Sequence, residues 1–162
     1  MGIYLFVIII SALMLLWLSR GPFFVPARRK DVPRIIGALH LKGGEKIVDL
    51  GSGDGRLLIA LAEAGAEAHG FEHNPLLVWR SRRNIRKAGH EGKAFVHYSN
   101  FWNKDFSRFD GAVIYGISYI MRRLEEKLLK EARPGMRIVS YSFFFPNWVP
   151  EHKEKGVYVY KK

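Results

Sequence analysis

The sequence contains no cysteine. This absence excludes disulfide bonds, catalysis by a thiolate and metal sites built on cysteine. Six histidines are present, but they are scattered without the spacing of metal ligands, so no metal site is predicted. Acidic residues are scarce: 15 of them face 26 basic residues, which gives a net charge of +11. Such a charge favours an anionic partner, for example a membrane surface, an acidic protein or a nucleic acid.

Charged residues are missing altogether from one long stretch near the N-terminus. Residues 3–18 read IYLFVIIISALMLLWL, and Ser11 is the one clearly polar side chain. A helix over residues 1–18 would be about 27 Å long, close to the ~30 Å hydrocarbon layer of a bilayer. A cleaved signal peptide would need a basic start and a small-residue cleavage site, and the sequence MGIYLF…LWLSRGPFF supplies neither. A buried core helix fits poorly, because the stretch is apolar on all sides. We therefore expect residues 1–20 to form a retained, single-pass transmembrane anchor.

Basic residues follow the apolar stretch along the chain, namely Arg20, Arg28, Arg29, Lys30 and Arg34. By the positive-inside rule, the rest of the chain is expected on the cytoplasmic side, or on the matrix side if the membrane is mitochondrial. A second basic cluster lies within residues 80–87. It is typical of an anionic membrane surface or of a solvated helix face.

Beyond residue 20, short apolar runs alternate with amphipathic stretches. They predict strands at residues 46–50, 66–71, 94–98, 112–115, 136–145 and 157–160, with helices between them, one of which starts at Asn74-Pro75. This alternation is typical of an α/β fold with a doubly wound, mostly parallel sheet. We expect residues 1–20 to be the anchor, 21–44 an arm with the first helix, and 45–162 the main domain.

A glycine-rich motif, VDLGSGDGR at residues 48–56, ends the first predicted strand. In doubly wound sheets, ligands bind at the carboxyl ends of the strands where the strand order reverses. The spacing is not the G-x-G-x-x-G of a dinucleotide site, and the Gly-Lys-Ser/Thr of a triphosphate loop is absent. Asp49 and Asp54 favour a cationic ligand, and S-adenosylmethionine is one. Glu72, which ends the next strand, is placed to accept the ribose hydroxyls of an adenosine.

Three motifs together carry a family resemblance: VDLGSGDGR, GFEHNPLLVWRSR and LKEARPGMRIVSYSFFFPNWVP. They are similar to class I methyltransferases, which have a Rossmann-like fold. More narrowly, they resemble the small protein-lysine methyltransferases that modify the ATP synthase c subunit and the adenine nucleotide translocase, and their prokaryotic relatives. The mitochondrial members also begin with a hydrophobic segment and a PFVP-like stretch, matched here by GPFFVP at residues 21–26. The resemblance spans nearly the whole chain and implies S-adenosyl-L-methionine as the cofactor.

The resemblance also implies which residues bind that cofactor. Val25 and Pro26 would fold over it, Glu72 would hold the ribose, and Asn100, where the family usually has an aspartate, would meet the adenine amino group. The full implied set is Val25, Pro26, Asp49, Gly51, Ser52, Gly53, Gly55, Glu72 and Asn100.

Methyl transfer to a lysine makes few demands on the protein beyond placement. The reaction is an in-line displacement from a sulfonium, so orientation and desolvation supply most of the rate. The lysine must be neutral when it attacks, and an apolar aromatic channel lowers its pKa. We expect Tyr115 and Trp148 to line this channel, with Tyr119, Phe144 and Phe145 as further candidates. Ordinary core packing explains Phe144 and Phe145 equally well.

Three functions are open at this point. The first is an anchored methyltransferase for a lysine of an integral membrane protein, with the ATP synthase c subunit as the first candidate. The second is a methyltransferase for a lipid-soluble small molecule, such as a quinone or lipid head group. The third is an anchored module that binds S-adenosylmethionine without turnover. Nucleic acid is not expected as a substrate, because YGIS at residues 115–118 replaces an Asn/Asp-Pro-Pro-Tyr-type motif.

Overall fold

The computed structural model describes residues 2–18, 26–116 and 118–162. Five α-helices and two short 3-10 helices lie in these ranges: α1 Gly2–Leu18, η1 Arg29–Asp31, α2 Val32–Gly37, α3 Arg56–Glu63, α4 Pro75–Lys87, η2 Phe101–Asn103 and α5 Ser118–Glu131. Seven strands alternate with them: β1 Lys46–Leu50, β2 Glu67–Glu72, β3 Ala94–Tyr98, β4 Gly111–Ile114, β5 Arg137–Tyr141, β6 His152–Glu154 and β7 Val157–Lys161.

The strands form one sheet in the order β3-β2-β1-β4-β5-β7-β6. All neighbours from β3 to β5 are parallel, whereas β7 runs antiparallel to both β5 and β6. From β1 the chain adds β2 and β3 on one side, and it then crosses back to add β4 on the other side of β1. The strand order therefore reverses between β1 and β4. The predicted doubly wound, mostly parallel α/β fold is confirmed.

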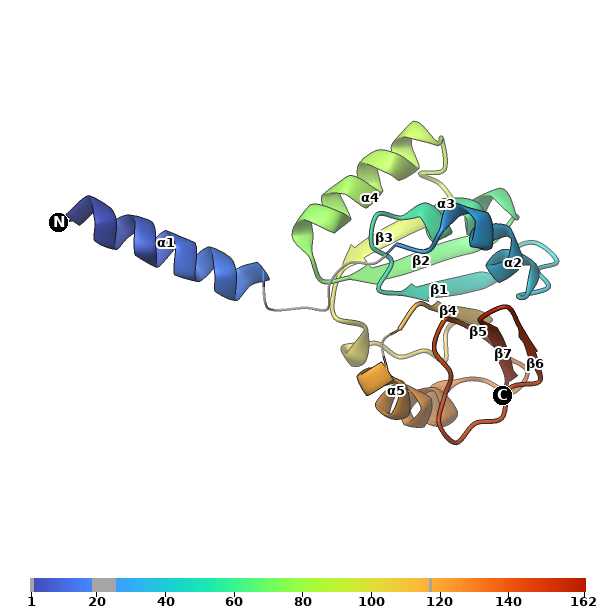
Figure 1. Cartoon of the computed structure of the whole chain (residues 1–162). Helices are drawn as coiled ribbons and strands as arrows, with labels where there is room; N and C mark the ends of the chain where they lie inside the picture. Colours follow the sequence, from blue (N-terminus) through green and yellow to red (C-terminus); the bar gives the residue numbers. More distant parts are fainter. Residues whose placement is uncertain (1, 19–25, 117) are drawn as a thin grey trace.

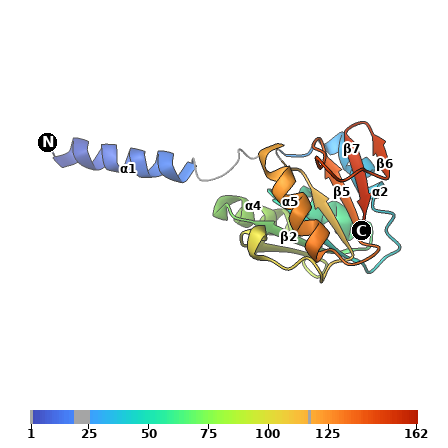
Figure 2. The ribbon, with the colours of Figure 1, turned by 90° about the horizontal axis from the view of Figure 1, so that it is seen from below.

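Helices cover both faces of the sheet (Figures 1 and 2). In Figure 1, α2, α3 and α4 lie above the strands and α5 lies below them. Alternate residues of β1 serve the two layers: Ile47 belongs to the core beneath α2, α3 and α4, and Val48 to the core over α5. Each layer is therefore held by the period-two alternation of buried strand side chains.

The strand predicted at residues 136–145 is shorter in the structure. β5 ends at Tyr141 because Ser142 adopts a left-handed backbone conformation, with φ of 68°, and its N–H donates to the carbonyl of Gly156 at 2.7 Å. Residues 143–151 then form an irregular loop, which leads into β6. β6 was not predicted because its three residues are all exposed and carry no apolar pattern.

The apolar N-terminal stretch forms α1, a helix of 17 residues that lies apart from the sheet in Figure 1. Its side chains from Gly2 to Ser11 are exposed. No helix within residues 2–18, 26–116 and 118–162 is both long enough and apolar enough to span a bilayer. The transmembrane part of the predicted architecture is therefore not confirmed by this fold.

Candidate functional site

The glycine loop connects β1 to α3 at the carboxyl edge of the sheet. The N–H groups of Gly51 and Ser52 donate to the carbonyl of Phe71, at 2.9 and 3.2 Å, which fastens the loop to β2. Gly51 has a φ of 88°, and a Cβ added there would meet open space, so its backbone conformation and not crowding requires glycine. At Gly55, an added Cβ would lie 2.2 Å from Oγ of Ser81 in α4. The loop is thus packed against α4 and open on the other side.

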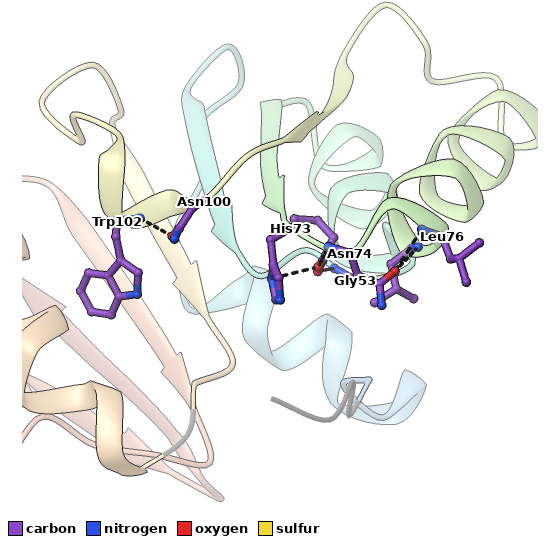
Figure 3. A network of polar contacts seen from close by, with 8 residues as sticks. Gly53, His73, Asn74, Leu76, Asn100 and Trp102 are labelled. Atoms are coloured by element: carbon purple, nitrogen blue, oxygen red, sulfur yellow. Dashed lines mark hydrogen bonds and ion pairs between the residues drawn. The ribbon is translucent and has the colours of Figure 1, made fainter. Parts of the chain in front are cut away.

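Glu72 ends β2 beside this loop and is almost fully buried, with 5% of its surface exposed. Its Oε2 accepts from the N–H of Gly53 at 3.0 Å, and its Oε1 accepts from the N–H of Asn74 at 2.8 Å (Figure 3). These two bonds fix the carboxylate between the glycine loop and the start of α4. Nδ1 of His73 lies 3.5 Å from Oε1. A carboxylate has about four lone-pair sites, so Oε2 can accept one further hydrogen bond, as from a ribose hydroxyl.

Asp49 lies on β1, the strand beside that of Glu72, and only 2% of its surface is exposed. Among the described residues, its Oδ2 has no hydrogen-bond partner. Burial, followed by the charges of Glu72 and Asp54, raises the pKa of Asp49 to about 7. A buried carboxylate without a partner is rare, and a bound cation would satisfy it. The ammonium at the methionine end of S-adenosylmethionine has the required charge.

Asp54 also lines the site, but unlike Asp49 it has a basic partner. Arg56 donates to both of its carboxylate oxygens, from Nε at 3.0 Å and from Nη2 at 2.7 Å. Burial raises the pKa of Asp54, but the hydrogen bonds and charge of Arg56 outweigh it, so that the net shift is downward. The expected negative charge of Asp54 is present and acts on Asp49, but Arg56 balances it. Asp49 and Glu72 supply the negative character of the site.

Arg56 has a second role that sequence reasoning missed. Its Nη1 donates to the carbonyl of Ala27 at 2.8 Å, which ties residues 26–31, the stretch of the arm before α2, to the glycine loop. At the other end of the arm, the hydroxyl of Tyr141 donates to Asp31 at 2.6 Å. The one signal in the sequence was Arg56 itself, a charged residue where the last glycine of a dinucleotide fingerprint would stand.

The arm and the glycine loop enclose a small cavity at this edge of the sheet. Its lining consists of Pro26, Ala27, Asp49, Gly51, Ser52, Asp54, Arg56, Leu57 and Tyr115. Pro26 lies in the lining beside the loop, and its predicted contact with the cofactor stays a prediction; Val25 lies outside the described residues. The structure brings together the predicted residues from β1, the loop and β2, and their contacts with a cofactor stay a prediction.

Asn100 follows β3 at the same edge. Its side-chain oxygen accepts from the N–H of Trp102 at 3.0 Å and so caps the short helix η2 (Figure 3). An amide oxygen has two lone pairs, so one is left for the predicted adenine contact. That contact is not tested by the structure.

The candidate channel residues separate into two groups. Tyr115 lines the cavity, and its ring centroid lies 5.0 Å from that of Tyr141. Phe145 is instead a core residue, 2% exposed, and its ring lies 5.7 Å from that of Trp148. Trp148 also packs on Tyr160, at 5.4 Å. Tyr119 and Phe144 are exposed on the surface. The core reading therefore holds for Phe145, and a channel role for Trp148 stays a prediction.

Comparison with known proteins agrees with this geometry. Residues 49–152 match the family profile of the ANTKMT methyltransferase domain. The chain belongs to this methyltransferase family. It is 42% identical over 129 residues to the mouse lysine N-methyltransferase of the ATP synthase c subunit, covering 80% of this chain and 52% of that protein. The predicted resemblance is confirmed.

Two further comparisons extend the range of similar proteins. A protein-lysine N-methyltransferase of Saccharolobus islandicus is 32% identical over 130 residues, which cover 79% of this chain and 81% of that one. An RNA methyltransferase of Salinibacter ruber, crystallised with S-adenosyl-L-homocysteine, superposes with a TM-score of 0.80 at 28% identity, covering 85% of this chain and 93% of that one. The chain spans about half the length of the mouse relative that it matches.

Proposed function

We propose that this chain is an S-adenosylmethionine-dependent methyltransferase that modifies a lysine side chain of a membrane protein. The observation that carries the proposal is the pair of buried carboxylates, Asp49 and Glu72, on adjacent parallel strands. Asp49 has an oxygen without a partner among the described residues, which suits an ammonium. Glu72 is held by two backbone N–H groups, which suits the binding of a ribose. Family membership supports the same conclusion.

The residues of the site would divide the work of binding and orientation. When bound, the cofactor supplies an activated methyl group on a sulfonium. Asp49 would hold the methionine end and Glu72 the ribose, while the arm, fastened through Ala27 and Asp31, would exclude water from above. Tyr115 would present an aromatic ring beside the loop, where an apolar surface keeps the incoming lysine neutral. No residue is assigned as a general base.

The acceptor is proposed from the relatives. The mouse relative's name gives the ATP synthase c subunit as its target. We propose that this chain likewise modifies a lysine at a loop or helix end of an integral membrane protein. We also propose that α1 anchors the chain in a membrane, because it is 17 residues long, apolar and exposed from Ile3 to Ile10. The basic residues behind it would keep the domain on the cytoplasmic or matrix side.

One observation favours a rival substrate. The Salinibacter ruber protein, which superposes well on this chain, is an RNA methyltransferase, and this chain carries a net charge of +11. RNA methylation is therefore the second candidate and has to be tested beside lysine methylation and beside the methylation of a quinone or lipid head group.

The test is a transfer assay with the full chain, radiolabelled S-adenosylmethionine and membranes from cells that lack this protein. We expect the label to run with a membrane protein and to be found on lysine by mass spectrometry. Glu72→Gln should abolish transfer, and Glu67→Gln, at the other end of the same strand, is the matched control. Label that extracts with lipid, or that is released by ribonuclease, would replace the lysine proposal with the corresponding alternative.

A further inference from the structure

Helix α4 carries an exposed stripe that the proposed reaction does not use. Its buried face consists of Val78, Ser81 and Ile85, which pack against the sheet. The opposite face is exposed and consists of Leu76, Trp79, Arg80, Arg82, Arg83, Arg86 and Lys87. These positions recur at intervals of three and four residues, so they lie on one side of the helix. In Figure 1, α4 is the outermost element on its side of the sheet. We call this set the α4 stripe.

The apolar and basic members of the α4 stripe are separated along the helix axis. Leu76 and Trp79 lie at the start of the helix and are each 62% exposed. The basic residues occupy the following turns. Helix α4 contains no aspartate or glutamate. Within the described parts of the chain, the one ion pair that the stripe forms joins Arg86 to Glu91 at 3.0 Å. The guanidinium of Arg83 lies 5.7 Å from the centre of the Trp79 ring.

We propose that the α4 stripe is a docking surface for an anionic lipid bilayer. A bilayer surface offers both environments that the stripe needs: negatively charged head groups for the arginines, and an interface in which leucine and tryptophan side chains are stable. An acidic protein surface or a duplex phosphate backbone would attract the arginines but leave Leu76 and Trp79 in water. A nucleic-acid single strand could stack a base on Trp79 but offers no apolar environment for Leu76. The occupant that suits all members of the stripe is therefore a lipid surface.

The position of α4 gives this docking a definite geometry. The helix starts at Pro75, three residues after Glu72, and Asn74 caps it by accepting from the N–H groups of Leu76 and Leu77. The apolar end of the stripe therefore lies at the carboxyl edge of the sheet, beside the cofactor site. Close packing of Gly55 on Ser81 fixes the helix to the glycine loop. Docking would hold that edge of the domain at the depth of the head groups.

Docking of the α4 stripe on a bilayer does not depend on the proposed methyl transfer. The use of docking to select lysines of membrane proteins rests on the proposed function. The test uses the full chain and exploits its lack of cysteine, since a single introduced cysteine can carry a dye that brightens in lipid. The reporting variant is Leu76→Cys, which leaves Trp79 and all the arginines in place. The control is Glu126→Cys, whose side chain is 69% exposed on α5, on the other face of the sheet. Circular dichroism confirms the fold of each labelled chain.

Dye emission is measured on chains bound to vesicles of phosphatidylcholine alone and of phosphatidylcholine with phosphatidylglycerol. We expect the dye at position 76 to enter lipid only when phosphatidylglycerol is present and to return to water at high salt. The dye at position 126 should stay in water throughout. Each basic residue near such a surface changes the equilibrium about fivefold, so Arg82→Gln with Arg83→Gln should lower the ratio of docked to undocked domain on the order of 20-fold.

Three outcomes would overturn the proposal. The dye at position 76 stays in water on anionic vesicles, or it enters lipid equally with and without phosphatidylglycerol, or it responds to single-stranded RNA or an acidic peptide but not to vesicles. The last result would assign the stripe to another class of partner. None of these results changes the outcome of the methyl-transfer assay, so the failure of either proposal can be recognised separately.

Discussion

The hydroxyl of Tyr141 donates a 2.6 Å hydrogen bond to Oδ2 of Asp31, across 110 residues of sequence. Tyr141 ends β5, and Asp31 ends the stretch of the arm that precedes α2. Arg34 adds an ion pair to the same carboxylate at 3.3 Å. Together with the bond from Arg56 to the carbonyl of Ala27, this contact holds the arm over the glycine loop at both ends. The closure of the arm over the site therefore depends on two long-range contacts.

Removing the hydroxyl tests the first of these contacts. Tyr141→Phe should leave Asp31 with Arg34 as its remaining partner and lower the free energy of unfolding by about 1–2 kcal/mol. Hydrogen exchange in residues 27–31 should accelerate, because the arm loses one of its two attachments. Tyr98→Phe, on a side chain that is 64% exposed, is the control and should change neither quantity. An arm equally protected in both variants would show that the bond does not hold it.

The same bond predicts a pH dependence. The hydrogen bond from Tyr141 lowers the pKa of Asp31, and the bond to Asp31 raises the pKa of Tyr141. Stability from the carboxylate is present above its ordinary pKa of about 4 and is lost as the pH falls through the lower folded value. Stability from the phenol is present below about 10 and is lost as the pH rises through its higher folded value. Protection of the arm against hydrogen exchange, taken relative to the intrinsic exchange rate at each pH, should thus be highest between these limits. In Tyr141→Phe, the loss of protection at high pH should vanish.

Asp49→Asn should raise the stability of the ligand-free fold at high pH and weaken the binding of S-adenosylmethionine. With a pKa raised to about 7, Asp49 keeps a proton that the unfolded chain loses near pH 4, so the stability of the ligand-free fold declines as the pH rises from about 4 to 7. The asparagine variant escapes this decline and should melt roughly 3–6 °C above wild type at pH 8, but not at pH 4. It should also bind S-adenosylmethionine about tenfold more weakly, because the ammonium loses a charged partner. Calorimetry and thermal melts check both; unchanged affinity would remove Asp49 from the site.

The pair of Asp54 and Arg56 should show strong coupling. In Arg56→Gln, the carboxylate of Asp54, whose side chain is only 8% exposed, loses its counter-charge, and we expect a loss of about 2 kcal/mol in stability. Adding Asp54→Asn should restore most of that loss. Because the bond to the carbonyl of Ala27 is absent from both variants, hydrogen exchange in the arm should be fast in each. Slow exchange in the double variant would mean that Arg56 does not hold the arm.

Trp148 needs a substitution that keeps its stacking. Trp148→Phe retains an aromatic ring against Phe145 and Tyr160, so the melting temperature should change little, whereas Trp148→Ala should lower it. If Trp148 lines the acceptor channel, Trp148→Phe should slow methyl transfer severalfold at unchanged affinity for the cofactor. Normal transfer by a stable phenylalanine variant would assign Trp148 to the core alone. Steady-state kinetics and calorimetry on the same preparation distinguish these results.

Features with local causes were predictable from the sequence. The start of α4 at Asn74-Pro75 follows from a capping side chain and a proline with fixed φ, and the structure confirms it. β1 was predicted over residues 46–50 and lies there, because a short apolar run bounded by glycines has few alternatives. Glu72 was placed correctly beside the glycine loop, since parallel strands end at one edge of a sheet.

Features that depend on distant parts of the chain were not predictable. The early end of β5 depends on a bond from Ser142 to Gly156. The pairing of Asp54 with Arg56 is local, but the sequence does not fix the orientation of the Arg56 side chain. The contact between Tyr141 and Asp31 joins two segments whose sequences carry no common pattern. The bonds made by Ser142 and Tyr141 join residues far apart in the sequence, so neither follows from a local pattern.

The place of β7 within the sheet has a consequence for synthesis on the ribosome. β7 follows all other strands along the chain, yet it lies between β5 and β6 and brings Tyr160 into the core against Phe145. Until residues 157–161 have left the exit tunnel, β5 has an unpaired edge and the core that packs on α5 lacks the ring of Tyr160. α1 emerges long before that moment. Under the proposed anchoring, the apolar helix would thus be accessible to targeting factors while the sheet is still open, and delivery to the membrane would precede folding.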